Sequence, residues 1–413
     1  MNINIHPQEQ KGLVPSTRLE QLDLWMTRLV DQGVLPFAMT VLQKGDQLVY
    51  WRWYGMTQPE NNLPAEPESV LRVYSMTKPV TVLTALLLEE QGLIDLEEPV
   101  ETWIPELAKP KALRKPEASL EECDLLETGP TLSQLMTHTS GYSYNAAGGS
   151  FLDQALDTRL GKKPSLNELL STLQELPLAF PPGSAWRYGL GIDVLGMVLM
   201  RAAEKPLGLL MEELIFEPLE MKNTSFALQD SQIPNHAHLY FARDGGGYSK
   251  IEDPFPGPSP GVDSVLPKSF PNHWGGAGLF STPSDWMKFS NMLRKAFKGE
   301  ENPVTTPDLV RRMASNQLTA DIASMLPEGP EGFREWMPFE GLGMGLGVWI
   351  AQDSKRLGWQ SNQGEFGWGG VANTVFWIDP VSDSNTMFFT QVMPSSKLGL
   401  RVELHRLAAS ILN

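Results

Sequence analysis

Cysteine, histidine and clustered positive charge are all scarce in this sequence. Among its 413 residues there is one cysteine, Cys123, and there are six histidines. A single cysteine cannot form an intrachain disulfide, so the cysteine content neither requires nor excludes an oxidising compartment. The histidines are scattered, and the sequence contains no H-E-x-x-H or C-x-x-C motif. We therefore expect no metal site and no cofactor.

Basic runs and long apolar runs are absent as well. The 33 Lys and Arg residues are outnumbered by 49 Asp and Glu residues, which gives a formal charge of −16. Such a charge repels phosphate backbones, so we expect no binding to nucleic acid. No stretch approaches the roughly 20 apolar residues that span a bilayer, and the N-terminus lacks the pattern of a signal peptide. The sequence predicts a cytoplasmic protein without membrane insertion, and it is compatible with a homo-oligomer.

The hydrophobic pattern divides the chain into predicted helices and strands. Residues 17–32 place apolar side chains at helical spacing, begin with a Thr17–Glu20 capping box and stop at Gly33. Residues 38–43 and 48–55 predict an antiparallel hairpin. Further helices are predicted at 80–91, 166–176, 191–205 and 401–412, and further strands at 236–242, 275–282, 342–350, 373–380 and 386–393. Strands at both ends around a helical middle predict a sheet built from both termini, with a helical domain inserted.

Ser75 stands three positions before Lys78, at the start of a predicted helix. Residues three apart lie on one helix face, so Lys78 would reach the Ser75 hydroxyl. Pro79 is tolerated only near a helix start, which places the serine where unpaired N–H groups favour a developing negative charge. Two interpretations stay open at this point: a nucleophile with its base one turn away, or a helix-capping serine beside a solvated lysine.

Two later segments favour the first interpretation. Tyr188 follows a Pro/Gly turn and directly precedes a predicted helix, and Gly369–Gly370 begins an apolar strand where bare backbone allows close approach of a ligand. Core packing for the tyrosine and an ordinary strand entry for the glycines are the alternatives. Ser259 lies in a G-P-S-P-G match to the nucleophile elbow of other hydrolases. Because Pro260 has no N–H for an oxyanion hole, we do not expect Ser259 to be catalytic.

Taken together, these segments resemble the serine β-lactamase and penicillin-binding-protein superfamily, and in particular its class C-like branch. LSQLMTHTSGY at 132–142 is similar to the L-L-x-H-T-S-G segment of that branch, and GGAGLFSTPSDWMKF at 275–289 to its G-G-x-G-L-x-S-T-x-x-D segment. The triplet Trp368-Gly369-Gly370 stands where lactamases have K-T-G or H-T-G, and Leu190 stands where they have the asparagine of Y-x-N. These two variants are similar to family VIII carboxylesterases. His273 begins a rival third motif, but it breaks the family's motif order.

The resemblance implies a fold and a site. It implies an α+β fold of the β-lactamase/transpeptidase type, with an antiparallel sheet flanked by N- and C-terminal helices. The discontinuous α/β domain would comprise residues 1–80 and 225–413, the inserted helical domain residues 81–224, and the active site would lie between them. Ser75 would be the nucleophile, Lys78 its activating partner and Tyr188 the second base. The oxyanion hole would be the backbone N–H groups of Ser75 and Val371, and His138 would be a buried, hydrogen-bonded structural residue. Gly369 and Gly370 would lie at the substrate. We further expect Trp368 and Tyr144 to line the acyl pocket, with core packing as the alternative for both.

From this we expect a serine carboxylesterase that hydrolyses apolar, short- to medium-chain esters through an acyl-Ser75 intermediate. Its partner would be a small-molecule ester, and the Lys78/Tyr188 pair would exchange protons as one unit. Apolar walls discriminate weakly, so broad substrate tolerance is expected, with transfer to other alcohols or weak β-lactam hydrolysis as side activities. Two alternatives remain: a class C β-lactamase or D-alanyl carboxypeptidase, and a binding protein of the same fold without turnover.

Overall fold

The computed structural model of the protein describes residues 3–115, 117–144, 149–161, 163–252, 254, 271–326 and 339–413. Ser259 lies outside these residues, so the structure does not test its exclusion. Within the described ranges, no helix is both long enough and apolar enough to cross a bilayer.

A nine-stranded sheet lies at the centre of the described structure, and all of its pairings are antiparallel. In order across the sheet, the strands are β1 (Asn4–Ile5), β3 (Gln47–Gln58), β2 (Phe37–Lys44), β15 (Ser384–Phe389), β14 (Val375–Asp379), β13 (Phe366–Gly369), β12 (Trp349–Ala351) and β11 (Leu342–Met344), with β4 (Leu63–Pro64) paired to β3. The two ends of the chain meet in the middle of the sheet, where Leu42 of β2 lies opposite Thr386 of β15. The predicted sheet from both termini is therefore confirmed.

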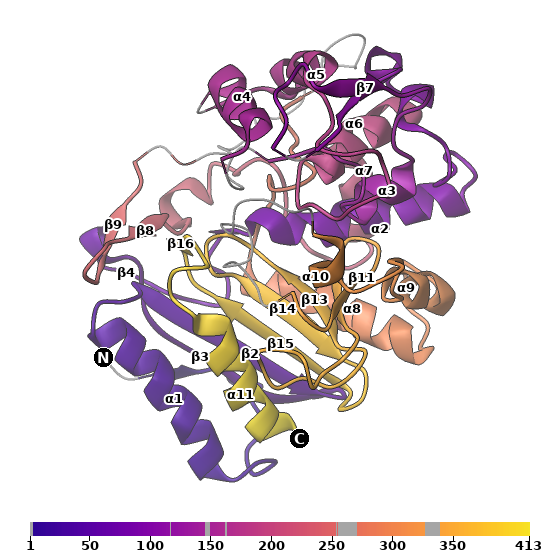
Figure 1. The fold of residues 1–413 in the computed structure, drawn as a ribbon. Helices are drawn as coiled ribbons and strands as arrows, with labels where there is room; N and C mark the ends of the chain where they lie inside the picture. Colours follow the sequence, from indigo (N-terminus) through magenta and orange to yellow (C-terminus); the bar gives the residue numbers. More distant parts are fainter. Residues whose placement is uncertain are drawn as a thin grey trace.

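Helices cover both faces of this sheet. α1 (Ser16–Asp31) and α11 (Leu400–Leu412) pack on each other and on β2, as Figure 1 shows. α8 (Pro283–Lys298) packs on β14 and β15 from the other face, with α9 (Pro307–Met313) beside it. Every residue of β14 and β15 is buried, because each strand is covered on both sides. This arrangement explains the apolar runs at residues 375–378 of β14 and 387–389 of β15. The first three residues of β15, Ser384, Asn385 and Thr386, are polar and also buried.

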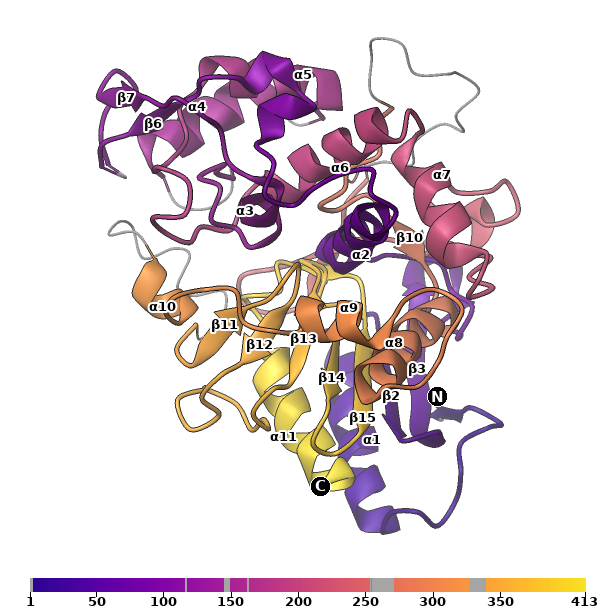
Figure 2. The same cartoon turned by 90° about the vertical axis from the view of Figure 1, so that its right-hand side faces the viewer.

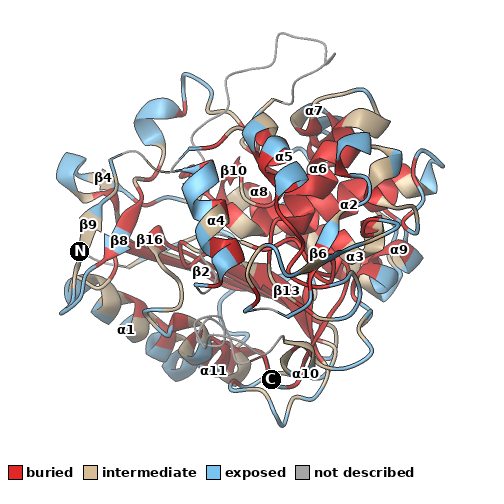
Figure 3. Cartoon of the chain, turned by 45° about the horizontal axis from the view of Figure 1, so that its top comes forward, coloured by how far each residue is buried: buried red, intermediate tan, exposed pale blue. Residues whose placement is uncertain are grey.

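A helical part lies beyond one edge of the sheet, with α2 (Thr77–Glu90) between the two (Figure 2). Its other members are α3 (Leu132–Met136), α4 (Phe151–Leu160), α5 (Leu166–Glu175), α6 (Gly191–Ala202) and α7 (Leu207–Met211), while α10 (Ile322–Met325) precedes β11 in the chain. Residues 77–88 of α2 are all buried, and α2 and α6 form the buried centre of this region in Figure 3. The domain boundaries predicted at residues 80 and 224 stay predictions.

Three small sheets complete the described structure. β5 (Leu71–Arg72) pairs with β10 (Phe280–Ser281), β6 (Lys111–Leu113) pairs with β7 (Cys123–Leu125), and β8 (Tyr240–Ala242) pairs with β9 (Tyr248–Lys250) and β16 (Val392–Met393). The β5–β10 pair matters for the site, because it holds the chain that leads into Ser75 against the segment that follows residue 275.

Several local predictions differ from the structure. α1 begins after Pro15 without a side-chain cap, so the predicted Thr17–Glu20 capping box is wrong. The predicted strand at 342–350 is two strands, β11 and β12, because Gly347 has a φ of +74° and turns the chain between them. The predicted strand at 386–393 ends at Phe389, and β16 follows as a separate strand.

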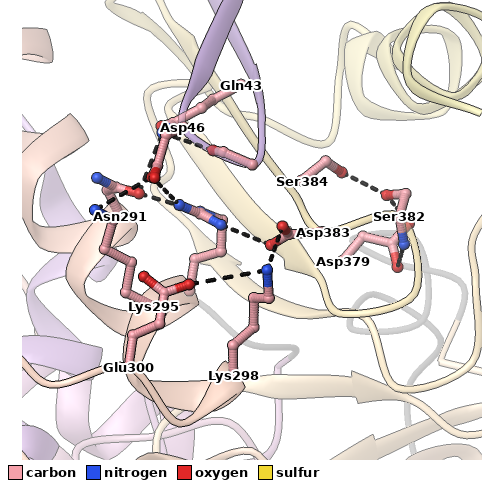
Figure 4. A network of polar contacts seen from close by, with 12 residues as sticks. Gln43, Asp46, Asn291, Lys295, Lys298, Glu300, Asp379, Ser382, Asp383 and Ser384 are labelled. Atoms are coloured by element: carbon pink, nitrogen blue, oxygen red, sulfur yellow. Dashed lines mark hydrogen bonds and ion pairs between the residues drawn. The ribbon is translucent and has the colours of Figure 1, made fainter.

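A buried arginine, Arg294, ties α8 to two turns of the sheet. Figure 4 shows Asp46 and Asp383 of these two turns together with Lys298 of α8. The Arg294 guanidinium donates to Asp383 in the β14–β15 turn at 2.6 Å and to Asp46 in the β2–β3 turn at 2.8 Å. Lys298 donates to the same Asp383 carboxylate at 2.6 Å. The network therefore fixes α8 on the strands that join the two ends of the chain.

We expect Arg294→Met to lower the free energy of unfolding by about 2 kcal/mol, because it removes charge-assisted hydrogen bonds to both turns. Lys295→Met removes only a partly exposed ion pair with Asp46, at 3.2 Å, and should change that free energy by less than about 1 kcal/mol. Urea unfolding followed by circular dichroism measures both. Equal losses in the two variants would contradict the importance given to Arg294.

Candidate active site

Ser75 lies in a single 3₁₀ turn, Tyr74–Met76, that runs directly into α2. The Val73 N–H donates to the Leu279 carbonyl at 3.1 Å and holds this turn in place. Pro79 is the third residue of α2, where its missing N–H breaks no helical hydrogen bond. Ser75 is half-buried while both of its neighbours are buried, so its hydroxyl is the accessible group of the turn.

The Lys78 side chain reaches the Ser75 hydroxyl, as the helical spacing predicts. Its Nζ donates to Ser75 Oγ at 3.2 Å and to the Gly276 carbonyl at 2.7 Å. The side chain is 1% exposed, which rules out the solvated lysine of the alternative interpretation. Burial of an amine without acceptors is costly, so these two oxygens hold it in one position.

Tyr188 completes a three-way contact. Its hydroxyl donates to Ser75 Oγ at 2.7 Å, and the Lys78 Nζ lies 4.7 Å from the centre of its ring. Tyr188 comes three residues before α6, whose start packs tightly on α3. A Cβ at Gly191 would lie only 2.9 Å from the Leu135 carbonyl oxygen, so glycine is needed for this approach.

Aromatic rings surround the Tyr188 side chain. The ring centre of Trp368 lies 6.0 Å from that of Tyr188, that of Tyr144 lies 5.9 Å away and that of His138 lies 4.7 Å away. Trp368 is buried and Tyr144 is half-buried. The structure thus brings both predicted pocket residues to the tyrosine, and they give this side of the site an apolar, aromatic wall.

His138 is buried as predicted, but its predicted hydrogen bonding is wrong. Within the described residues, neither ring nitrogen has a hydrogen-bond partner, and the ring packs among Trp186, Tyr188 and Trp368. Burial holds the pKa of His138 well below its usual value, and the nearby charge of Lys78 adds to that effect. The imidazole is therefore neutral in the ordinary pH range.

The end of β13 lies against the segment that leads into Ser75. A Cβ at Gly370 would lie 2.5 Å from the Val73 carbonyl oxygen, which explains the glycine. Val371 packs near Tyr74 in a small apolar cluster. In the part of the chain that the structure describes, the N–H groups of Ser75 and Val371 donate no backbone hydrogen bond. Their use as an oxyanion hole stays a prediction.

Sequence patterns did not indicate two further groups near the site. Asp193 is a buried carboxylate whose Oδ1 accepts from the Gly276 N–H at 2.8 Å. Arg401, in the first turn of α11, donates to the Gly370 carbonyl at 3.1 Å. Burial lowers the pKa of Arg401 to about 10, so it stays charged at neutral pH. The one sequence feature that could have pointed to Asp193 is the glycine pair Gly275-Gly276, because paired glycines indicate a place where another segment approaches the backbone closely.

The rival motif residue His273 lies elsewhere. Its Nδ1 accepts from the Gly208 N–H at 3.0 Å, and its ring stacks on Phe226 at 4.6 Å. Among the described residues, no group of three or more His, Cys, Asp or Glu side chains is arranged to hold a metal ion.

This fold and this contact of serine, lysine and tyrosine agree with the similarity of the chain to known proteins. The chain belongs to the Beta-lactamase family, whose family model matches residues 22–410. The predicted β-lactamase/transpeptidase-like fold is thereby confirmed.

Relatives within this family include an esterase and acyltransferases. Esterase EstB of Burkholderia gladioli is 26% identical over 389 residues, which cover 90% of this chain and 89% of EstB. Acyltransferase calJ of Penicillium decumbens is 28% identical over 347 residues, which cover 80% of this chain and 78% of calJ. The solved structure of EstCE1, described as a hydrolase with promiscuous acyltransferase activity, has a TM-score of 0.77 at 22% identity and covers 96% of this chain and 99% of its own. That likeness shows the shared fold.

We expect Gly370→Ala to reduce the labelling rate of Ser75 by a fluorophosphonate at least about tenfold, because the new Cβ pushes β13 away from Val73. Far-UV circular dichroism should stay unchanged. Gly364→Asn is the control, since no atom lies within 4 Å of a Cβ there and asparagine tolerates its positive φ. A wild-type labelling rate for Gly370→Ala would show that this close contact does not shape the site.

Proposed function

We propose that this protein is a serine carboxylesterase that cleaves apolar carboxylic esters through an acyl-Ser75 intermediate. The observation that carries the proposal is the joint contact of the Lys78 amine and the Tyr188 hydroxyl with Ser75 Oγ, at 3.2 and 2.7 Å. A serine hydroxyl is a weak nucleophile at neutral pH and needs a positioned base. No described histidine contacts Ser75, so the lysine and tyrosine divide that work.

Acylation begins when Ser75 Oγ attacks the ester carbonyl carbon and its proton passes to the Lys78/Tyr188 pair. The carbonyl electron pair moves to the oxygen, which the N–H groups of Ser75 and Val371 stabilise. The tetrahedral intermediate then collapses, the bond to the alcohol oxygen breaks, and the leaving alkoxide takes the proton from the pair. Loss of one oxyanion donor in such sites costs about 3 kcal/mol.

Deacylation repeats the sequence with water. The Lys78/Tyr188 pair removes a proton from water as its oxygen attacks the acyl carbon, and it returns the proton to Ser75 Oγ as the acid leaves. An alcohol in place of water would yield a new ester. The esterase and acyltransferase relatives are consistent with either acceptor.

The aromatic wall supports an apolar acyl group as substrate. Trp368 stands in the triplet where lactamases carry a cationic or donor side chain, and an indole cannot form an ion pair with a carboxylate. With Tyr144 it would contact the acyl chain. Because an apolar wall discriminates by only about 1 to 3 kcal/mol per methylene, short- and medium-chain esters should both be accepted.

Three substitutions test the assignment of the nucleophile and its bases. Ser75→Ala should abolish nitrophenyl ester hydrolysis above background, Lys78→Met should lower kcat about a thousandfold, and Tyr188→Phe about a hundredfold. Steady-state rates and a mass-spectrometric search for an acyl-serine measure these effects. Ser75→Ala with more than a trace of activity would overturn the proposal.

Val371→Ala provides a matched control within the site. Val371 would act through its backbone N–H, which alanine keeps, so we expect kcat to fall less than about tenfold. A loss as large as that of Ser75→Ala would assign a different role to the Val371 side chain.

Arg401 favours a second candidate function. It is a cation at Gly370 with no carboxylate partner among the described residues, and it would suit a substrate that carries its own carboxylate. Such a protein would be a β-lactamase or D-alanyl carboxypeptidase, the alternative weighed above. A chromogenic cephalosporin hydrolysed at least as efficiently as a nitrophenyl ester, with a loss in Arg401→Leu, would favour it.

A third possibility is a binding protein of the same fold that catalyses no reaction. It predicts no covalent fluorophosphonate adduct on Ser75. Parallel assays with short and long nitrophenyl esters, the cephalosporin, and an ester with added alcohol separate all of these functions.

A further inference from the structure

Asp193 is a buried carboxylate that the acyl-transfer steps do not use. It lies in the first turn of α6, a few residues after Tyr188, and it is 2% exposed. Its Oδ1 accepts from the Gly276 N–H at 2.8 Å, and the Gly276 carbonyl accepts from the Lys78 Nζ at 2.7 Å. One glycine therefore connects the carboxylate to the amine that contacts Ser75.

This arrangement depends on bare backbone between α2 and α6. A Cβ at Gly276 would lie 2.5 Å from Asp193 Oδ2, and a Cβ at Gly275 would lie 2.7 Å from the Ile192 carbonyl oxygen. The Thr81 hydroxyl of α2 donates to the Gly275 carbonyl at 2.6 Å. The two glycines are thus wedged between the helices, and a side chain at either one would separate the carboxylate from the amine.

The charges of Lys78 and Asp193 complement each other. Within the described residues, Lys78 forms no direct ion pair, and Asp193 is an acid whose charge acts on it across Gly276. Burial raises the pKa of Asp193, while the positive charge of Lys78 opposes that rise. Opposite charges that are both buried in a medium of low dielectric attract each other more strongly than they would in water.

We propose that Asp193 is a positioning residue for Lys78, which fixes the amine through Gly276 and stabilises the positive charge that the amine carries when it accepts the Ser75 proton. The inference rests on the proposed function only in assigning that proton transfer to the Lys78/Tyr188 pair. Because Tyr188 lies three residues before α6 and Asp193 lies in its first turn, the start of this one helix would place both the second base and the counter-charge of the first.

Other titratable groups that face the pair do not change charge between about pH 5 and 9. Burial holds the pKa of His138 well below its usual value, and burial raises the pKa of Tyr74 to about 12 and that of Tyr144 further. Arg401, on α11, has its pKa lowered to about 10 by burial and stays charged. A difference between the Asp193 variants and the wild type in this pH range is therefore not caused by these four groups.

The test is the pH dependence of Ser75 labelling by a fluorophosphonate in Asp193→Asn, which keeps an acceptor oxygen but removes the charge. The nearby anion favours the protonated pair, so its loss lets the pair lose its proton at lower pH. We expect the acidic limb of the profile to move down by on the order of one pH unit, with a maximal rate about tenfold lower. Asp193→Glu should keep the limb near its wild-type position.

Asp285→Asn is the matched control. Asp285 is equally buried in the first turn of α8, where it accepts hydrogen bonds from Asn223 and Thr224, away from Ser75. It should lower the thermal midpoint without moving the limb. If Asp193→Asn does not fold, Asp193→Ser is the second uncharged variant, and the same shift is required.

The outcomes separate this inference from the proposed function. An acidic limb that superposes on the wild-type limb in the uncharged Asp193 variants overturns the role of Asp193, whatever substrate the enzyme cleaves. Labelling of Ser75 with normal pH dependence but no ester hydrolysis overturns the carboxylesterase and leaves the Asp193 test in force, since labelling does not require an ester substrate.

Discussion

The buried amine of Lys78 sets the main constraint on this structure. It is 1% exposed, and its hydrogen bonds go to the Ser75 hydroxyl and the Gly276 carbonyl. A buried amine needs hydrogen-bond acceptors close by, because otherwise nothing offsets the free energy that its desolvation costs. The ring of Tyr188 and the carboxylate of Asp193 supply further negative potential. The segments that carry these groups must therefore keep fixed positions relative to one another when the protein folds around Lys78.

Bare backbone lets these segments approach one another. Gly370 brings the end of β13 against Val73, Gly191 brings α6 against α3, and Gly276 admits the Asp193 carboxylate. A side chain at any of the three would disturb its contact, because a Cβ would lie within 3 Å of the Val73 carbonyl oxygen, the Leu135 carbonyl oxygen or the Asp193 carboxylate. The site is thus built from a helix start, a strand end and a loop, and their mutual distances are set by glycine.

The site has a polar side, where we expect proton transfer, and an apolar side, where we expect the acyl group to bind. Lys78 and Tyr188 contact the Ser75 hydroxyl, and Asp193 is linked to Lys78 through Gly276. In the proposed mechanism, the proton moves among these polar groups. His138, Trp368 and Tyr144 surround Tyr188 with rings and leave the substrate few polar partners on that side. In the proposed esterase, such a site would favour apolar acyl groups by burial, and the acyl group would pass to water or to an alcohol, whichever reaches the acyl carbon.

Periodicity and motif order were enough for the class of fold and the principal contact. Ser75 and Lys78 are three residues apart, across the 3₁₀ turn and the first turn of α2, so local geometry alone brought them together. The apolar residues of β14 and of the second half of β15 indicated buried strands. Resemblance placed Tyr188 beside them. The sequence did not reveal Asp193, Arg401 or the unpartnered ring of His138, nor the break of the 342–350 segment into two strands at Gly347. The break at Gly347 is a local turn, whereas the other three features arise between segments far apart in the chain. Burial and backbone contact decide them, and no local sequence pattern specifies which distant group packs at a given position.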